Sequence, residues 1–119
     1  GRALLVFPRH QDPEVLGGVL EEERVVWSAV DSLDAAIRSI IADPPDMALV
    51  HSEMHGPEAS EILAALRADP RTRNVVLLGC GSVSDRQSLA RILSAGAVDF
   101  LLPPYSPERI RERVLRRIH

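Results

Sequence analysis

Five short apolar runs, each followed by a helical pattern, constrain the fold of this chain more than any other feature. The runs occupy residues 3–7, 25–29, 47–50, 75–78 and 100–102. Polar residues, glycine or proline end each run, which predicts five β-strands. Amphipathic patterns between and after the runs predict helices over 13–21, 33–42, 58–68, 85–95 and 107–118. Ser106 before Pro107 is a predicted helix N-cap, and either Asp31 or Ser32 caps the second helix.

The run at 75–78 indicates the kind of sheet. It is apolar without alternation, as expected for a central parallel strand that is buried on both faces. Five βα units with right-handed crossovers build a three-layer α/β sandwich with helices on both faces of a five-stranded parallel sheet. The flavodoxin-like strand order 2-1-3-4-5 is expected, in one domain over residues 1–119.

Composition excludes several classes of function. The net charge of −3 and the scarcity of aromatic residues argue against nucleic-acid binding by this domain alone. No apolar run is long enough for a membrane span. The single cysteine, Cys80, cannot form an internal disulfide, so we expect a reducing, cytoplasmic setting. All 14 basic residues are arginine, and the chain contains no lysine.

Several segments in the right order resemble response-regulator receiver domains, the CheY-like family. They are Pro-Asp-Met-Ala-Leu-Val at 45–50, Met-His-Gly at 54–56, Leu-Arg-Ala-Asp-Pro-Arg-Thr at 66–72, and the stretch from Ser94 to Glu108 that contains Gly96-Ala97 and Pro103-Pro104. The resemblance covers essentially the whole chain. It implies a module of bacterial two-component signal transduction, excised from a longer regulatory protein.

The resemblance also implies that the phosphorylation chemistry is absent. Receiver domains use acidic residues after the first strand to hold magnesium, an aspartate as phosphoacceptor, then a hydroxyl residue and a lysine. The corresponding positions in this chain are Phe7, Pro8, His51, Gly79 and Pro103. None of these residues supplies a carboxylate, an aspartate nucleophile or a cationic side chain. We therefore expect a degenerate, or pseudo-receiver, variant with no catalytic residue, no cofactor and no metal.

Three functions remain open. The first is a phosphorylation-independent module that acts through protein–protein interaction and is not an enzyme. The second is a ligand- or metal-sensing pseudo-receiver, because His10, His51 and His55, with Glu53, Asp12 and Cys80 nearby, fall at the carboxyl edge of the sheet. The simpler interpretation of these histidines is that they are solvated loop residues. The third, least favoured, is an active phosphoacceptor.

Receiver domains bind partners through the fourth helix, fifth strand and fifth helix, so the resemblance implies an interaction surface there. Its candidate residues are Leu89, Arg91, Leu93, Asp99, Leu102, Tyr105 and Arg113. The leucines and Tyr105 are expected to be exposed, and Arg91, Asp99 and Arg113 match residues that form intersubunit ion pairs. These imply a partner protein, an effector domain or a homodimer. Phe100 matches the family's switch aromatic, expected here in one fixed rotamer, and the Pro103-Pro104 bond is predicted to be cis.

Overall fold

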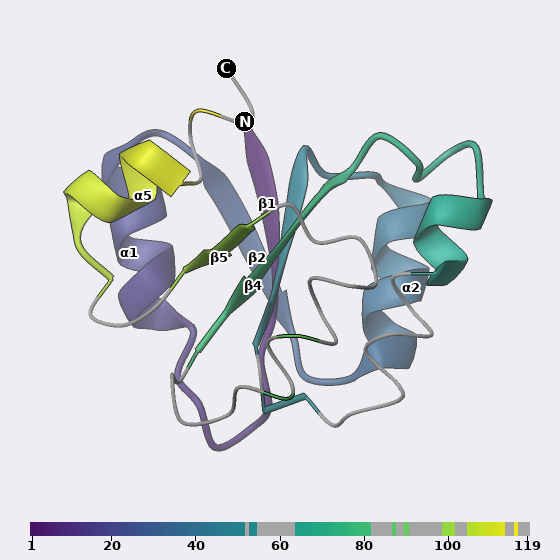
Figure 1. The fold of residues 1–119 in the computed structure, drawn as a ribbon, viewed down its shortest axis with the longest axis horizontal. Coiled ribbons are helices and arrows are strands. Elements are labelled where there is room, and N and C mark those ends of the chain that lie inside the picture. Colours follow the sequence, from purple (N-terminus) through teal and green to yellow (C-terminus); the bar gives the residue numbers. More distant parts are fainter. Residues whose placement is uncertain are drawn as a thin grey trace.

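The five predicted strands form one parallel sheet in the order β2-β1-β3-β4-β5 in the computed structural model of the chain. The structure describes residues 1–51, 53–54, 64–81, 87, 90, 99–101, 105–113 and 116. The strands are β1 (Arg2–Val6), β2 (Val26–Val30), β3 (Met47–His51), β4 (Val76–Cys80) and β5 (Asp99–Leu101). Figure 1 shows the sheet in the middle of the molecule. The predicted fold and strand order are confirmed.

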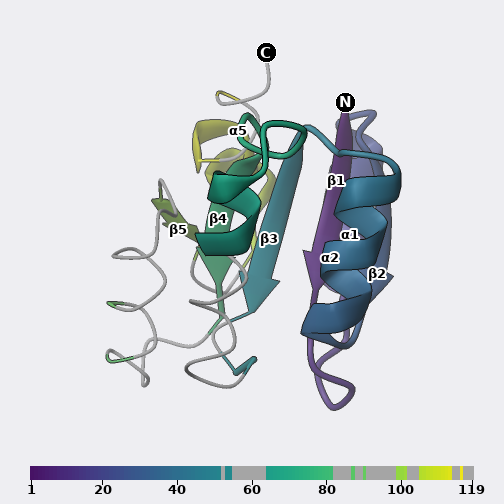
Figure 2. The same cartoon turned by 90° about the vertical axis from the view of Figure 1, so that its right-hand side faces the viewer.

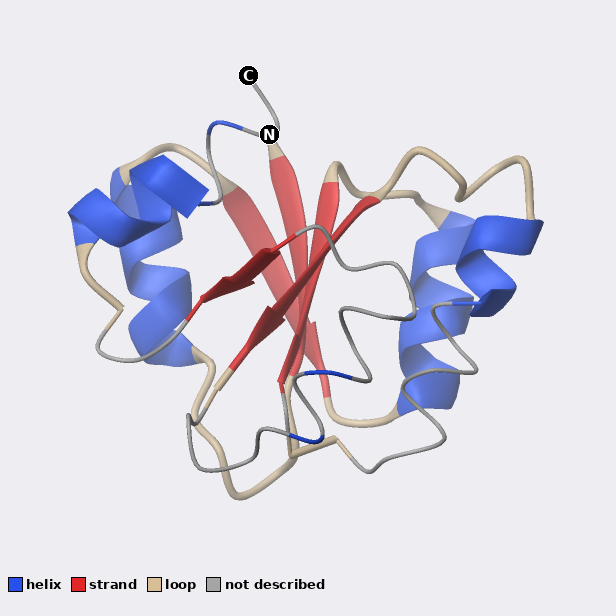
Figure 3. Ribbon diagram, in the orientation of Figure 1, coloured by secondary structure: helices blue, strands red, loops and turns tan. Residues whose placement is uncertain are grey.

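Helices cover both faces of this sheet. The helices are α1 (Glu14–Glu22), α2 (Leu33–Ala42) and α5 (Pro107–Arg113), and residues 64–68 are also helical. α1 and α5 lie on one face, whereas α2 and the 64–68 segment lie on the other (Figure 3). Figure 2 shows the second pair in front of the sheet. The predicted helix over 85–95 falls largely outside the described residues.

Local chemistry sets where the elements begin. Ser32 caps α2, because its Oγ accepts a hydrogen bond from the Ala35 amide at 3.1 Å. Of the two predicted caps, Ser32 is therefore the one used. Ser106 caps α5 as predicted, with its Oγ accepting the Arg109 amide at 3.2 Å. β2 begins one residue later than expected because the Val25 amide donates to the Leu20 carbonyl in the turn after α1.

Each face of the sheet carries its own apolar core. On the α2 face the core includes Leu4, Val50 and Leu77, and on the α1 and α5 face it includes Leu49 and Leu78. β4 is buried from Leu77 to Cys80, as expected for a strand covered on both sides. Together these two cores fix the ends of β1, β3 and β4 relative to one another.

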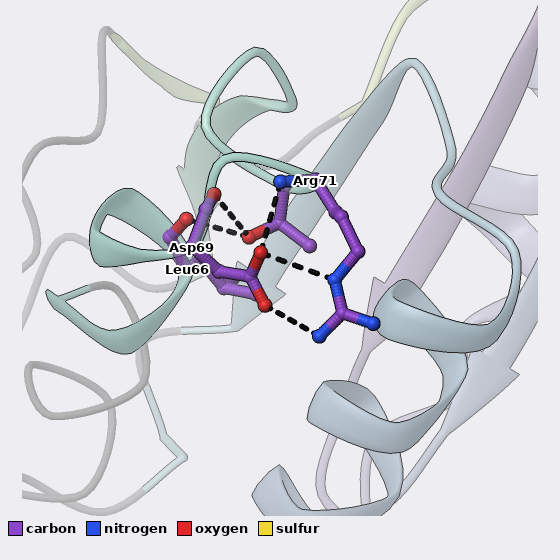
Figure 4. Close-up of polar contacts among 4 residues, drawn as sticks. Leu66, Asp69 and Arg71 are labelled. Atoms are coloured by element: carbon purple, nitrogen blue, oxygen red, sulfur yellow. Dashed lines mark hydrogen bonds and ion pairs between the residues drawn. The ribbon is translucent and has the colours of Figure 1, made fainter.

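The turn that leads into β4 is closed by a compact group of polar contacts (Figure 4). Asp69 accepts the Arg71 amide at 2.9 Å and pairs with the Arg71 guanidinium at 2.8 Å. Thr72, which is buried, donates its hydroxyl to the Leu66 carbonyl at 2.6 Å. These contacts give the Leu-Arg-Ala-Asp-Pro-Arg-Thr segment a structural role. The segment fixes the start of β4, the strand that ends at the candidate site.

Among the described residues, the helices are all too short or too polar to cross a lipid bilayer.

Candidate functional site

The residues expected to form the family's phosphorylation pocket meet at the carboxyl edge of the sheet. Val6 is the register partner of Val50, and Val50 is the partner of Gly79, so β1, β3 and β4 end side by side. Phe7 follows β1 directly, and its ring lies edge-on to the ring of His51, with centroids 5.0 Å apart. Among the five predicted positions Pro103 lies outside the described residues.

His51 closes the end of β3 as a buried residue. Only 4% of it is exposed, and its Nδ1 accepts a hydrogen bond from the Glu53 amide at 3.0 Å. Burial lowers the pKa of the imidazole from its ordinary value, which favours the neutral ring. The expectation of a solvated loop histidine is therefore wrong for His51, because the ring packs on Phe7 and forms part of the strand end.

Glu53 draws the loop after β1 onto the loop after β3. One of its carboxylate oxygens, Oε2, lies 2.7 Å from His10 Nε2 and accepts the Gln11 side-chain amide at 2.9 Å. The hydrogen bond from His10 is the main reason why the pKa of Glu53 is lowered. Sequence reasoning did not include Gln11, because a single amide in a loop carries no motif. Asp12 is engaged elsewhere: its Oδ1 accepts a hydrogen bond from the Glu14 amide at 2.9 Å, just before the start of α1.

The histidine cluster does not assemble into a metal centre in the part of the chain that is described. No three His, Cys, Asp or Glu side chains among those residues converge at metal-binding geometry. His10 and His51 are both near Glu53, but His51 already uses Nδ1 to accept a backbone amide. His55 lies outside the described residues.

The side chains at this edge do not suit magnesium either. Magnesium prefers oxygen ligands in octahedral geometry, usually one or two carboxylates with water. Phe7, Pro8 and His51 offer no side-chain oxygen. The carboxylate of Glu53, two residues after His51, receives hydrogen bonds from His10 and Gln11. The family's ion therefore has no matching donor set at these positions.

Cys80 and Tyr105 form a second buried contact near the end of β4. Cys80 is fully buried, and burial raises the pKa of its thiol, which disfavours the reactive thiolate. The Tyr105 hydroxyl is hydrogen-bonded to the Cys80 side chain, and Tyr105 packs against the core of the α1 and α5 face. Tyr105 is thus half-buried, which corrects the expectation of an exposed apolar residue.

The expected interaction surface is described only in part. Arg113 and Asp99 form an ion pair within one chain, with Arg113 Nη1 2.9 Å from Asp99 Oδ1. Phe100 is half-buried and is the register partner of Gly79. Four predicted members, Leu89, Arg91, Leu93 and Leu102, lie outside the described residues, as does the Pro103-Pro104 bond.

Comparison with known proteins gives a consistent result. The family model for the response regulator receiver domain matches residues 11–115. The two-component response regulator ORR5 of Oryza sativa subsp. japonica is 31% identical over 112 residues, covering 88% of this chain and 81% of that protein. The phosphate regulon transcriptional regulatory protein PhoB of Escherichia coli is 24% identical over 120 residues, and the chain spans 52% of it.

Solved structures agree in fold. A putative response regulator from Chloroflexus aurantiacus superposes with a TM-score of 0.86 at 22% identity, covering 98% of this chain and 96% of that one. The receiver domain of the Pseudomonas aeruginosa sensor histidine kinase PA1611, described with a magnesium ion coordinated in its active-site cleft, gives a TM-score of 0.85 at 20% identity, with the same coverage of both chains.

Proposed function

The chain belongs to the response regulator receiver domain family, and we propose that it is a member that signals without being phosphorylated. In this proposal it is a two-component signalling module that works by binding another protein and catalyses no reaction. The finer part of the proposal, its independence of phosphorylation, comes from the residues at the carboxyl edge of the sheet.

The observation that carries the proposal is that a buried, hydrogen-bonded histidine, His51, occupies the position of the phosphoacceptor. A phosphoacceptor aspartate must reach a phosphodonor with an ionised carboxylate, whereas His51 is 4% exposed and offers an imidazole. Its Nδ1 accepts the Glu53 amide, and its ring contacts Phe7. Phosphorylation of His51 would therefore require either the hydrogen bond to its Nδ1 or the contact of its ring with Phe7 to be broken.

Charge supports the same conclusion. Phosphoryl transfer depends on cations that neutralise the transferred group, usually a metal ion and a basic side chain. The PA1611 receiver domain is described with magnesium in its cleft, whereas the matching edge of this chain carries Phe7, Pro8 and His51. The lysine that serves the family is replaced by Pro103, and no lysine exists elsewhere in the chain.

Protein–protein contact is the remaining mode of output. The chain spans 52% of PhoB and 26% of the Caulobacter vibrioides response regulator PleD, so its relatives carry further segments. We propose an effector domain or partner protein that contacts the surface of β5 and α5, and a homodimer through the same surface as the alternative. In a homodimer, the pair of Arg113 with Asp99 would open and re-form between subunits, and sedimentation that shows only monomer at high micromolar concentration would contradict that alternative.

Beryllofluoride with magnesium tests the proposal, since it mimics a phosphoryl group on an aspartate. We expect no saturable change in the amide NMR spectrum of this chain, and a saturable change in the PA1611 receiver domain as the matched control. Trp27 fluorescence is a poor reporter, because Trp27 is the register partner of Ala3, near the opposite end of β1 from Phe7. Saturable shifts around His51 would contradict the proposal.

A further inference from the structure

A pocket of about 520 Å³ opens beside the closed phosphorylation edge, at the carboxyl ends of β1 and β2. It lies between the start of α1 and the start of α2. Its apolar lining residues are Phe7, Pro8, Pro13, Ala29, Val30 and Ala35. The volume falls within the roughly 300–1,000 Å³ that is typical of small-molecule sites. Sheets of this class bind ligands at the carboxyl ends of their strands where the strand order reverses, which here is between β1 and β3, and this pocket lies on the neighbouring side of β1.

The backbone holds the floor of this pocket in place. The Phe7 amide donates to the Val30 carbonyl at 3.0 Å, which ties the end of β1 to the end of β2. The Gln11 amide donates to the Pro8 carbonyl at 3.0 Å and closes the following turn. Both lining prolines further restrict the chain. The pocket is therefore bounded by a hydrogen-bonded strand end and a constrained turn, and it is a preformed pocket that is open to solvent.

The polar part of the lining is one ion pair and one amide. Arg9 Nε lies 2.7 Å from Asp31 Oδ2, and the Arg9 side chain is 90% exposed. A guanidinium has five N–H donors, and this contact uses one of them. Exposed ion pairs are weak, so an incoming carboxylate can take the remaining donors in a two-point contact. Gln11 is held by Glu53 at 2.9 Å.

We propose that this pocket binds a small amphipathic carboxylate, with an aromatic or branched apolar body on the floor and its carboxylate on Arg9. Apolar lining makes up most of the pocket, which favours the apolar body of the ligand. The inference extends the proposed function, because a bound ligand would regulate a module that is not phosphorylated. The evidence for the binding itself is the geometry of the pocket.

The direct test is an NMR titration of the chain with indole-3-acetate and phenylacetate, each matched with its neutral amide. We expect saturable shifts of the Val30, Asp31 and Ala35 amides at millimolar or lower concentrations of the acids. Arg9→Gln should weaken the acids about tenfold, since a hydrogen bond to a charged group is lost, and leave the amides unchanged. Equal weakening of acids and amides would overturn the assignment of the carboxylate to Arg9.

Filling the pocket provides the second test. Ala35→Leu, in the first turn of α2, and Ala29→Leu, in the β2 wall, should each abolish the shifts. The matched control is Ala42→Leu, because Ala42 is exposed at the other end of α2 and should leave binding unchanged. Undiminished binding to both filled variants, or no saturable shift in the unsubstituted chain with any probe, would overturn the proposal. The titrations contain neither magnesium nor a phosphodonor, so their outcome is independent of the phosphorylation result.

Discussion

At the ends of β1 and β3, the rings of Phe7 and His51 are packed against each other, whereas the ends of β1 and β2 leave a pocket of about 520 Å³. Phe7 takes part in both regions. On the His51 side, Phe7 is part of the buried core at the edge where we propose that the family's acidic pocket is absent. On the other side, Phe7 lines the apolar floor of the open pocket. The comparison teaches that an apolar residue at a strand end can close one potential site and shape its neighbour.

The largest expected effect is a loss of stability when the contact between Phe7 and His51 is removed. Phe7 is 4% exposed, so Phe7→Ala should lower the free energy of unfolding by about 3–5 kcal/mol, through lost burial and the cavity left behind. Urea denaturation followed by circular dichroism measures it. Val15→Ala is the control, because Val15 is 62% exposed and should change stability by less than about 0.5 kcal/mol. A loss below about 1 kcal/mol for Phe7→Ala would show that the region is not packed as described.

Restoring the family's carboxylate at the end of β3 should also destabilise the chain. His51→Asp places an acid where the ring is now buried, and we expect a loss of about 2–5 kcal/mol at pH 8. Burial raises the folded pKa of such a carboxyl above its unfolded value of about 3.9, so the loss grows as pH rises through that value. Urea denaturation at pH 4.5 and pH 8 measures it, with His51→Gln as the uncharged control. Full stability of His51→Asp at pH 8 would contradict a desolvated site.

A smaller effect on stability is expected from the protonation of His51 in the unsubstituted chain. Its folded pKa lies below the unfolded value of 6.5, so the unfolded chain takes up the proton first. This contribution to stability is complete above pH 6.5 and is lost as pH falls from there towards the folded pKa. Between pH 6.5 and 5, the stability of His51→Gln should fall less steeply than that of the unsubstituted chain in denaturation series. Identical slopes would mean that the ring is not held neutral by burial.

The smallest effect is expected on the open side. Arg9→Gln removes one exposed ion pair and should change stability by about 0–1 kcal/mol. Arg2→Gln, which removes the exposed pair of Arg2 with Asp43, is the control and should behave alike in thermal melts. A loss above about 2 kcal/mol for Arg9→Gln would show that Arg9 stabilises the fold. The residues around the pocket would then be as important for stability as the contact between Phe7 and His51.

The sequence predicts the frame of this molecule well because the frame depends on local patterns. α2 spans the predicted residues 33–42, and each strand begins within one residue of its predicted start. The order of the strands follows from alternating βα units and right-handed crossovers. Convergence of Phe7 and His51 follows from the same topology, because parallel strands end at a shared edge.

What the sequence does not predict is how side chains fill the ends of the strands. The burial of His51 depends on the approach of Phe7 from another strand, and the inward position of Tyr105 depends on Cys80. The pocket beside Arg9 depends on the path of a loop rich in proline and polar residues, which apolar periodicity does not describe. These contacts join distant parts of the chain, so no local signal marks them.

The central claim is our proposal that this chain is not phosphorylated at the carboxyl edge of its sheet. It is tested most directly by the intact mass of the chain after incubation with acetyl phosphate and magnesium. The predicted result is an unchanged mass under conditions in which the PA1611 receiver domain gains one phosphoryl group. A stable gain of one phosphoryl group that disappears in His51→Gln would contradict the account, since it would place a working nucleophile where the structure has a buried, hydrogen-bonded ring.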